Sequence, residues 1–149
     1  MNRERADLED IRALIDRYAI LGDVGRVDEL AGLFTLDGVL ETGTWRCDGR
    51  TAIRERLAGG GQPEEPGLTF MRHHVTSSDL VLIDEAAASG RTYFLVITNV
   101  GMDRAGTYVD AFRREDGSWR FSHRAVRMDW ISDRSLMPAQ PTRHPSVRA

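Results

Sequence analysis

Lysine is absent from this sequence, and all 20 residues counted as lysine plus arginine are arginines. Without a lysine amine, Schiff-base chemistry and every other lysine-dependent mechanism are excluded. Cysteine is nearly absent as well, since Cys47 is the only one. A single cysteine cannot form an intrachain disulfide, and it cannot build a cysteine-rich zinc or iron–sulfur site.

Long apolar runs and a surplus of positive charge are also missing. No stretch approaches the roughly 18 apolar residues of a membrane span, and the first residues do not form a charged-then-apolar leader. We therefore expect a cytoplasmic protein that binds no membrane. The net charge of -3 argues against a nucleic-acid partner, because nucleic-acid-binding proteins normally carry a basic surface.

The first part of the chain has the three- and four-residue apolar spacing of helices. This spacing, with Asp7 available as the N-cap, predicts a helix over residues 7–21. Two glycines then interrupt the pattern, and a second short helix is expected over 27–34. Thr51 can cap a third helix over 51–57.

The rest of the chain is predicted to be strands separated by short polar turns. The expected strands cover residues 39–42, 45–47, 70–78, 80–84, 90–100, 107–114 and 119–128. Asp116-Gly117 is the clearest hairpin signal. The run 93–97 is apolar at both parities, which predicts a central strand covered on both faces.

Helices first and an antiparallel sheet second is the order of an α+β domain with its helices on one side of a curved sheet. At 149 residues the chain has the length of one domain, and we expect that domain to span residues 1–135. Residues 136–149 are rich in proline and have little to bury. They predict a tail that is disordered or packs on a neighbouring subunit.

Two adjacent histidines, His73 and His74, lie on one predicted strand. Neighbouring strand side chains leave on opposite faces, so the two cannot share a metal ion. No other histidine has carboxylates at ligand spacing, and we expect no metal. No cofactor is expected either, because the glycines at 59–61 are followed by Gln-Pro rather than by the helix of a phosphate loop.

Short motifs follow one another in a recognisable order along most of the chain. They are LIDRYA at 14–19, Asp23, DELAGLF at 28–34, DG at 37–38, GR at 49–50, RHHVTS at 72–77 and DGSWRF at 116–121. In order and spacing they resemble the SnoaL-like branch of the NTF2-like superfamily over about residues 5–132. The resemblance implies a cone-shaped α+β fold, with three N-terminal helices packed on a strongly curved mixed, mostly antiparallel sheet that encloses a pocket.

The branch that this chain resembles most contains scytalone dehydratase, bile-acid 7α-dehydratase and hexachlorocyclohexane dehydrochlorinase, which are cofactor-independent lyases. They share an Asp at the break between the first helices and a His on the following sheet, and the matching positions are Asp23 and His73. A shift of one residue in strand register would place His74 in the pocket instead. A carboxylate bonded to one imidazole nitrogen makes the other more basic, so the pair implies a general base.

Tyr18 stands where the bile-acid dehydratase pattern has a tyrosine and the dehydrochlorinase pattern has a lysine. A phenol can give a proton to a leaving hydroxide or polarise a carbonyl, which favours loss of water over loss of halide. Arg124 falls where the dehydrochlorinase has an arginine near its site. Tyr108 and Asp110, which share one strand face, and Trp45 are further candidates for the pocket lining.

Each of these residues also has a purely structural interpretation. Asp23 could cap the second helix, and His73 could be a hydrogen-bonded sheet residue. Tyr18 lies on the apolar stripe of the first helix and could belong to the core. Arg124 could form a surface or interface salt bridge, and Trp45 could lie in the core, the pocket or an interface.

The sequence thus predicts a dehydratase-like lyase that eliminates water from a small hydrophobic cyclic or polyketide-like substrate through an Asp–His dyad. A cyclase, an isomerase or an epoxide hydrolase could use the same dyad. A non-catalytic ligand-binding or assembly module is the third alternative, since function depends on the site rather than the fold. We further expect a homotrimer or homodimer, with the outer sheet face and the chain after Trp130 at the interface.

Overall fold

The computed structural model describes residues 2–59, 66–137 and 141–142. In these ranges the helices are α1 (Arg3–Asp23), α2 (Val27–Ala31) and α3 (Arg50–Ala58), and the strands are β1 (Phe34–Glu41), β2 (Arg46–Asp48), β3 (Met71–Leu82), β4 (Ala87–Thr98), β5 (Gly101–Glu115) and β6 (Ser118–Ile131). The strands form one sheet in the order β2-β1-β6-β5-β4-β3. Among these named strands, β1 and β6 are the one pair that runs in parallel. The predicted α+β fold with a mixed, mostly antiparallel sheet is confirmed, and the sheet is not closed into a barrel.

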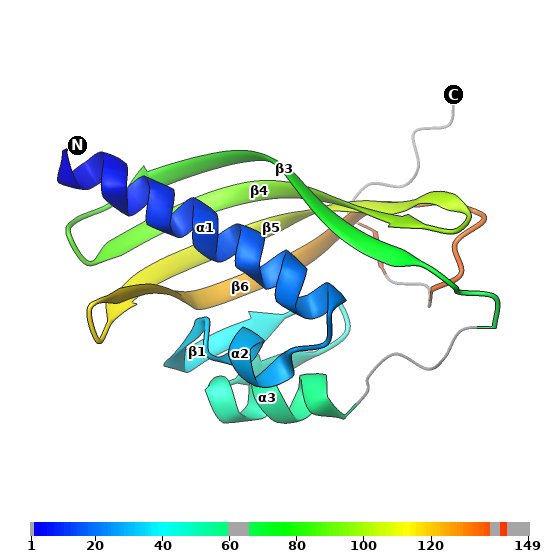
Figure 1. The fold of residues 1–149 in the computed structure, drawn as a ribbon, viewed down its shortest axis with the longest axis horizontal. Coiled ribbons are helices and arrows are strands. Elements are labelled where there is room, and N and C mark those ends of the chain that lie inside the picture. Colours follow the sequence, from blue (N-terminus) through cyan, green and yellow to red (C-terminus); the bar gives the residue numbers. More distant parts are fainter. Residues whose placement is uncertain (1, 60–65, 138–140, 143–149) are drawn as a thin grey trace.

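The helices lie on one side of the sheet (Figure 1). Helix α1 crosses the sheet and contacts β3 and β6, while α3 packs on β1 and β2. Ile11 and Ile15 of α1 meet Phe34, Phe112 and Phe121 of the sheet in a fully buried core. The apolar stripe of the first helix is therefore the surface that fixes α1 to the sheet.

Helix α1 begins earlier than predicted, and Asp7 is not its N-cap. The Asn2 side chain is the cap and accepts a hydrogen bond from the Arg5 backbone N–H at 2.8 Å. Asp7 is buried and accepts hydrogen bonds from the Trp119 indole and from the Arg114 guanidinium. An acidic residue near a helix start has the right type for a cap, but here its partners come from β5 and β6.

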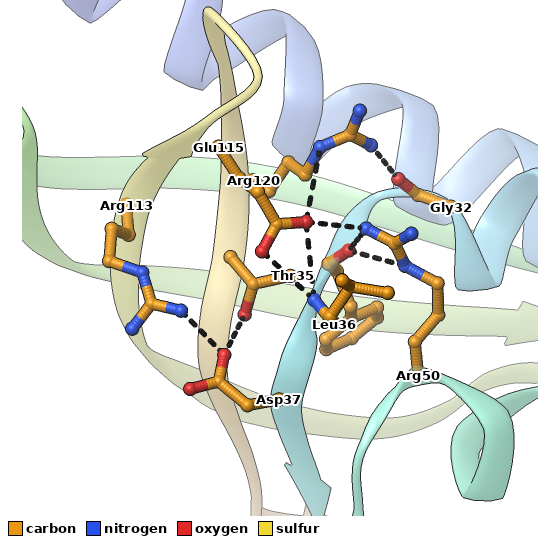
Figure 2. A network of polar contacts seen from close by, with 9 residues as sticks. Gly32, Thr35, Leu36, Asp37, Arg50, Arg113, Glu115 and Arg120 are labelled. Carbon is orange, nitrogen blue, oxygen red and sulfur yellow. Dashed lines mark hydrogen bonds and ion pairs between the residues drawn. The ribbon is translucent and has the colours of Figure 1, made fainter.

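The chain turns into β1 at Phe34, where the sequence predicted the end of the second helix. Arg50 donates from Nε and Nη2 to the Phe34 carbonyl, at 2.9 and 2.6 Å, and from Nη2 to Glu115 at 2.8 Å. Glu115 in turn accepts the Leu36 backbone N–H at 3.0 Å. Figure 2 shows this network joining the start of β1, α3 and the end of β5. These partners are distant in sequence, so the local pattern could not reveal them.

The strands after the helices are longer than predicted. The expected strands over 70–78 and 80–84 are one strand, β3, with an irregularity between Val75 and Ser78. The Asp116-Gly117 hairpin is confirmed, and both residues have positive φ, 52° and 77°. Positive φ at both central residues is what the two-residue type I′ turn requires.

The prediction that the strand around residues 93–97 is covered on both faces is wrong. Phe94 and Val96 are buried, but the Tyr93 side chain is 53% exposed. All helices of the described chain lie on the inner face (Figure 1), so no helix in that part of the chain covers the outer face there. Apolar residues at both odd and even positions of a strand therefore do not show whether its second face is covered by a helix or exposed.

The proline-rich segment predicted over 136–149 lies largely outside the described residues, which omit 138–140 and 143–149. Its first residues contact the sheet, because the Leu136 backbone N–H donates a hydrogen bond to the Asp103 carboxylate of β5 at 3.2 Å. The boundary at residue 135 stays a prediction. Among the residues that the structure describes, no helix is both long and apolar enough to span a membrane.

Candidate active site

A cavity of about 270 Å³ lies between the helices and the inner face of the sheet. Most of its wall is apolar, with Leu30, Leu40, Val96, Val126 and Met128 among the lining residues. Its volume is slightly below the range of about 300–1,000 Å³ that is usual for ligand sites. The cavity therefore suits a small molecule.

Asp23 and His73 meet at this cavity, as the resemblance implied. The Asp23 carboxylate bonds to His73 Nδ1 through Oδ1 at 2.7 Å and accepts the His73 backbone N–H through Oδ2 at 2.9 Å. The Asp23 side chain is 7% exposed and the His73 side chain is 28% exposed. The carboxylate is thus enclosed, while the imidazole forms part of the cavity wall.

The position of Asp23 is explained by this contact and not by helix capping. Asp23 is the last residue of α1, and the N-cap of α2 is Arg26. A carboxylate at a helix C-terminus is disfavoured by the helix dipole, so the two hydrogen bonds from His73 offset an unfavourable location. The alternative in which Asp23 caps the second helix is wrong.

Strand alternation determines which of the two adjacent histidines reaches the cavity. On β3, Met71 and His73 point inward and line the cavity. His74 is exposed on the opposite face, so the interpretation of His74 as a lining residue is wrong. The register expected from the resemblance is the one in the structure.

Tyr18 lines the cavity from α1 and packs edge-on against other aromatic rings. Its ring centroid lies 6.2 Å from that of Phe34, 5.8 Å from that of Tyr108 and 5.7 Å from that of Phe121. Burial raises the pKa of the Tyr18 phenol. Tyr18 therefore belongs to the core and to the cavity wall at once, and it keeps its proton.

Arg124 and Asp110 form a completely buried ion pair beneath the tyrosines. Arg124 Nε and Nη2 donate to the two Asp110 oxygens at 2.8 and 2.7 Å. The guanidinium carbon lies 4.2 Å from the Tyr18 ring centroid and 3.8 Å from that of Tyr108. Burial alone would lower the pKa of Arg124, but the ion pair outweighs burial and raises it.

Neither member of this ion pair lines the cavity, so the prediction of direct pocket contact is wrong for Arg124 and Asp110. The surface interpretation of Arg124 is wrong too, because its side chain is 0% exposed. A charge this deep is stable only when it is paired. The rings of Tyr18 and Tyr108 line the cavity and lie against the Arg124 guanidinium.

The predicted lining residues Tyr108 and Trp45 do reach the cavity. Tyr108 stacks on Phe94 with 4.3 Å between ring centroids. This stacking requires a glycine at 106, because a Cβ there would lie 2.5 Å from the Phe94 ring. Trp45 has the Arg56 guanidinium carbon 4.6 Å from its ring centroid.

Arg104 is a cavity residue that the sequence analysis missed. Its guanidinium donates from Nε to Asp103 at 3.0 Å and from Nη2 to Ser135 at 2.9 Å. The predicted strand began at residue 107, but Arg104 has the same parity as Tyr108 and Asp110. This shared parity could have identified Arg104 if the predicted strand had been extended toward the N-terminus.

The polar side chains around the cavity determine which chemistry it can support. Within the described ranges, no group of three or more histidine, cysteine, aspartate or glutamate side chains is arranged to hold a metal ion. The polar groups around the cavity are instead an imidazole–carboxylate pair, phenols and guanidinium groups. These groups can transfer protons and hold a developing negative charge.

Three solved structures from Novosphingobium aromaticivorans are similar to this chain. A candidate scytalone dehydratase is 23% identical, with a TM-score of 0.78 and coverage of 95% of this chain and 97% of the other. An NTF2-like protein with a cystatin-like fold is 26% identical, with a TM-score of 0.73 and coverage of 89% and 86%. The β subunit of a candidate aromatic-ring-hydroxylating dioxygenase is 19% identical, with a TM-score of 0.71 and coverage of 90% and 96%.

These likenesses support the NTF2-like fold and include both a candidate enzyme and a subunit of a larger assembly. No curated protein matches the chain. The family comparison is more specific, because the SnoaL-like domain matches residues 3–125, which is most of the sequence. The chain therefore belongs to the SnoaL-like domain family.

Proposed function

We propose that this protein is a cofactor-independent lyase that removes water from a small hydrophobic cyclic or polyketide-like substrate. The observation that carries the proposal is the bond of 2.7 Å between Asp23 and His73 Nδ1 at the wall of an apolar cavity. A buried carboxylate on one nitrogen of an imidazole is the arrangement of a general base. Tyr18 at the same cavity adds a hydroxyl group for the leaving oxygen.

The direction of proton transfer follows from the chemistry of the pair. An ionised carboxylate only accepts hydrogen bonds, so Nδ1 of His73 carries the proton and Nε2 is the base. Nε2 takes a proton from a carbon next to a carbonyl, and hydroxide leaves the next carbon. The electron pair of the broken C–H bond ends as the new double bond between these two carbons. The imidazolium returns the proton to the hydroxide, which departs as water.

Tyr18 acts in this scheme as a hydrogen-bond donor. Because burial raises the pKa of its phenol, complete loss of the proton is disfavoured. The hydroxyl group can still donate to the leaving oxygen and stabilise the charge that develops there. Asp23, through its bond to Nδ1, stabilises the imidazolium while it exists.

The test is a screen of small cyclic hydroxyketones by mass spectrometry, in which dehydration lowers the substrate mass by one water. Asp23→Asn and His73→Ala are expected to abolish turnover of a substrate found in this way. His74→Ala is the matched control, because His74 is exposed on the opposite face of the same strand. The mechanism is wrong if both dyad variants keep wild-type turnover.

An isomerase or cyclase is the second candidate. The observation that favours it is Tyr18, whose raised pKa suits a donor that polarises a carbonyl without giving up its proton. The same dyad could then move a proton between two carbons without expelling a group. A product of unchanged mass in the screen separates this activity from dehydration.

We also propose that the outer face of the sheet contacts further copies of this chain in a dimer or trimer. Tyr93, Met102 and Trp130 on that face are 53%, 49% and 37% exposed. Large exposed apolar side chains close together commonly mark interaction sites. Light scattering tests the proposal, and the mass of a single chain contradicts it.

A further inference from the structure

Arg104 and Met102 point to opposite faces of the sheet, although they are two positions apart, because β5 contains an extra residue between them. Met102 pairs with Ile97 and Arg104 pairs with Val96, so Asp103 has no partner position on β4. This bulge reverses the alternation, since Met102 is 49% exposed on the outer face and Arg104 is only 2% exposed on the inner face. Bulges of this kind often redirect a side chain next to an active site.

The sheet register places Arg104 in line with the base. His73 pairs with Val96 across β3 and β4, and Val96 pairs with Arg104 across β4 and β5. His73 and Arg104 thus flank Val96 on the inner face, with backbones about 10 Å apart at two strand spacings. All three side chains line the cavity, so one small ligand over Val96 can contact both polar groups.

The Arg104 guanidinium is held in place before any ligand arrives. Asp103 Oδ1 accepts from Arg104 Nε at 3.0 Å and from the Ser135 hydroxyl at 2.7 Å, and Ser135 also accepts from Arg104 Nη2 at 2.9 Å. A guanidinium has five N–H donors and can serve several acceptors at once. A fixed donor in an enclosed site stabilises developing negative charge without reorganisation.

The charges around the cavity indicate what kind of oxygen this group receives. Among the described residues, the buried charged groups that line the cavity or lie directly beneath its lining are Arg104 and Arg124, which are positive, and Asp23, Asp103 and Asp110, which are negative. Arg56, which stacks on Trp45, is exposed to solvent and is not counted. With His73 neutral, the balance is one negative charge. A carboxylate ligand would add a second negative charge in a poorly solvated site, whereas a neutral carbonyl adds none.

We propose that Arg104 binds the carbonyl oxygen of a neutral cyclic ketone and stabilises the enolate that His73 forms from it. The inference rests on the proposed function and names its substrate class. His73 Nε2 takes the proton next to the carbonyl, the C–H electron pair forms the carbon–carbon double bond, and the carbonyl π pair moves to the oxygen at Arg104. When the C=O bond re-forms, hydroxide leaves the β-carbon and takes the proton from His73 as water.

The charge balance is preserved throughout this step. The imidazolium forms beside Asp23, and the enolate oxygen forms beside Arg104, so each new charge lies next to an opposite one. The net charge of the site stays the same because the proton only moves from the ligand to His73.

Binding of 1-tetralone, compared with the same bicyclic skeleton lacking oxygen, tetralin, tests the inference. The wild-type protein is expected to bind the ketone more tightly, and Arg104→Met is expected to reduce this preference by about 10- to 100-fold, the contribution of one hydrogen bond to a charged group. Arg72→Met is the matched control, since Arg72 is exposed on the outer face. Arg104→Lys, which keeps the charge, is expected to retain part of the preference.

Removing Arg104 alone leaves Asp103 buried without one of its partners, and the single variant could misfold for that reason. A second variant is therefore used as a control. Asp103→Asn combined with Arg104→Met removes both charges, which costs far less than breaking a buried pair. The double variant is expected to fold and to bind tetralin as the wild type does. Circular dichroism and thermal unfolding check the fold.

Deuterium exchange at the acidic carbon of 1-tetralone separates this inference from the proposed function. His73→Ala is expected to lose catalysed exchange but to keep the ketone preference in binding, whereas Arg104→Met loses both. Exchange that is independent of His73, together with an Arg104-dependent preference, contradicts the proposed function and leaves the Arg104 site in place. The inference is overturned if the wild type shows no ketone preference, or if Arg104→Met and the double variant keep the full preference.

Discussion

Asp23 holds both the ring and the backbone of His73, at 2.7 Å from Nδ1 and 2.9 Å from the backbone nitrogen. The two residues are 50 positions apart and belong to α1 and β3. One carboxylate therefore sets the ring orientation and also fastens the end of the helix to the edge strand of the sheet. The position of the base and the packing of α1 on β3 depend on the same pair of hydrogen bonds.

The dyad predicts strongly non-additive effects on turnover. Asp23→Asn and His73→Ala are each expected to lower kcat by about 100- to 10,000-fold, the usual contribution of general acid–base catalysis. Because the two residues act as a unit, the double variant should be little worse than His73→Ala alone. Steady-state kinetics on the screened substrate measure this, and multiplicative losses would show that the residues act independently.

For the buried ion pair of Arg124 and Asp110, we predict that removing one member destabilises the protein much more than replacing both. Arg124→Met leaves Asp110 buried and uncompensated, and should lower the free energy of unfolding by about 3–5 kcal/mol. Replacing both residues, as in Arg124→Met with Asp110→Leu, should cost much less. Urea unfolding measures the difference, with Arg91→Met, an exposed position, as the control. Equal losses in the single and double variants would contradict the explanation.

Burial of two tyrosines predicts unusual alkaline behaviour. Burial raises the pKa of Tyr18 and of Tyr108 above the ordinary value of 10. In a Tyr93→Phe variant these are the only tyrosines left, so tyrosinate absorbance should not appear at pH 10 while the protein is folded. A spectrophotometric titration checks this, and the same titration in denaturant gives the ordinary curve. Ionisation of the folded variant near pH 10 would mean that the rings are accessible to water.

Asp7 predicts a loss of stability in acid. The hydrogen bond from Trp119 lowers the pKa of the Asp7 carboxyl, burial opposes the shift, and Arg114 lowers the pKa further. Because the folded pKa is below the reference value of 3.8, the contribution is complete above that pH and is lost as the pH falls through the folded value. Asp7→Asn should be less stable than wild type at pH 7, and the gap should narrow below pH 3.8. If the difference in the free energy of unfolding between wild type and Asp7→Asn stayed constant across this pH range, the effect of the substitution would come from packing and not from the charge of Asp7.

Much of the fold could be predicted because it depends on neighbours in the sequence. The stripe of Ile11 and Ile15 at helical spacing identified α1, and Asp116-Gly117 identified the hairpin between β5 and β6. The motif order led to Asp23 and His73, which the structure brings into contact. Periodicity, turn chemistry and motif spacing are all local, so they remain readable without a structure.

Other features depend on partners that lie far away in the chain, and only the tertiary structure decided them. Asp7 has a side chain suited to capping, but Trp119 and Arg114 take it into the core. Arg124 could have been a surface residue, but its ion pair with Asp110 allows complete burial. The type of a side chain limits what it can bind, whereas its actual partner depends on which segments the fold brings together.

The sequence by itself determined the classes of chemistry available to this protein and the order of its helices and strands. It excluded lysine chemistry, because the chain has no lysine, and cysteine-rich metal sites and intrachain disulfides, because Cys47 is the single cysteine. The tertiary structure decided which polar groups face the cavity. The bulge at Asp103 separates the inward-facing Arg104 from the outward-facing Met102. The register of β3 turned His73 inward and His74 outward, because the face of a strand residue depends on pairing that composition does not encode.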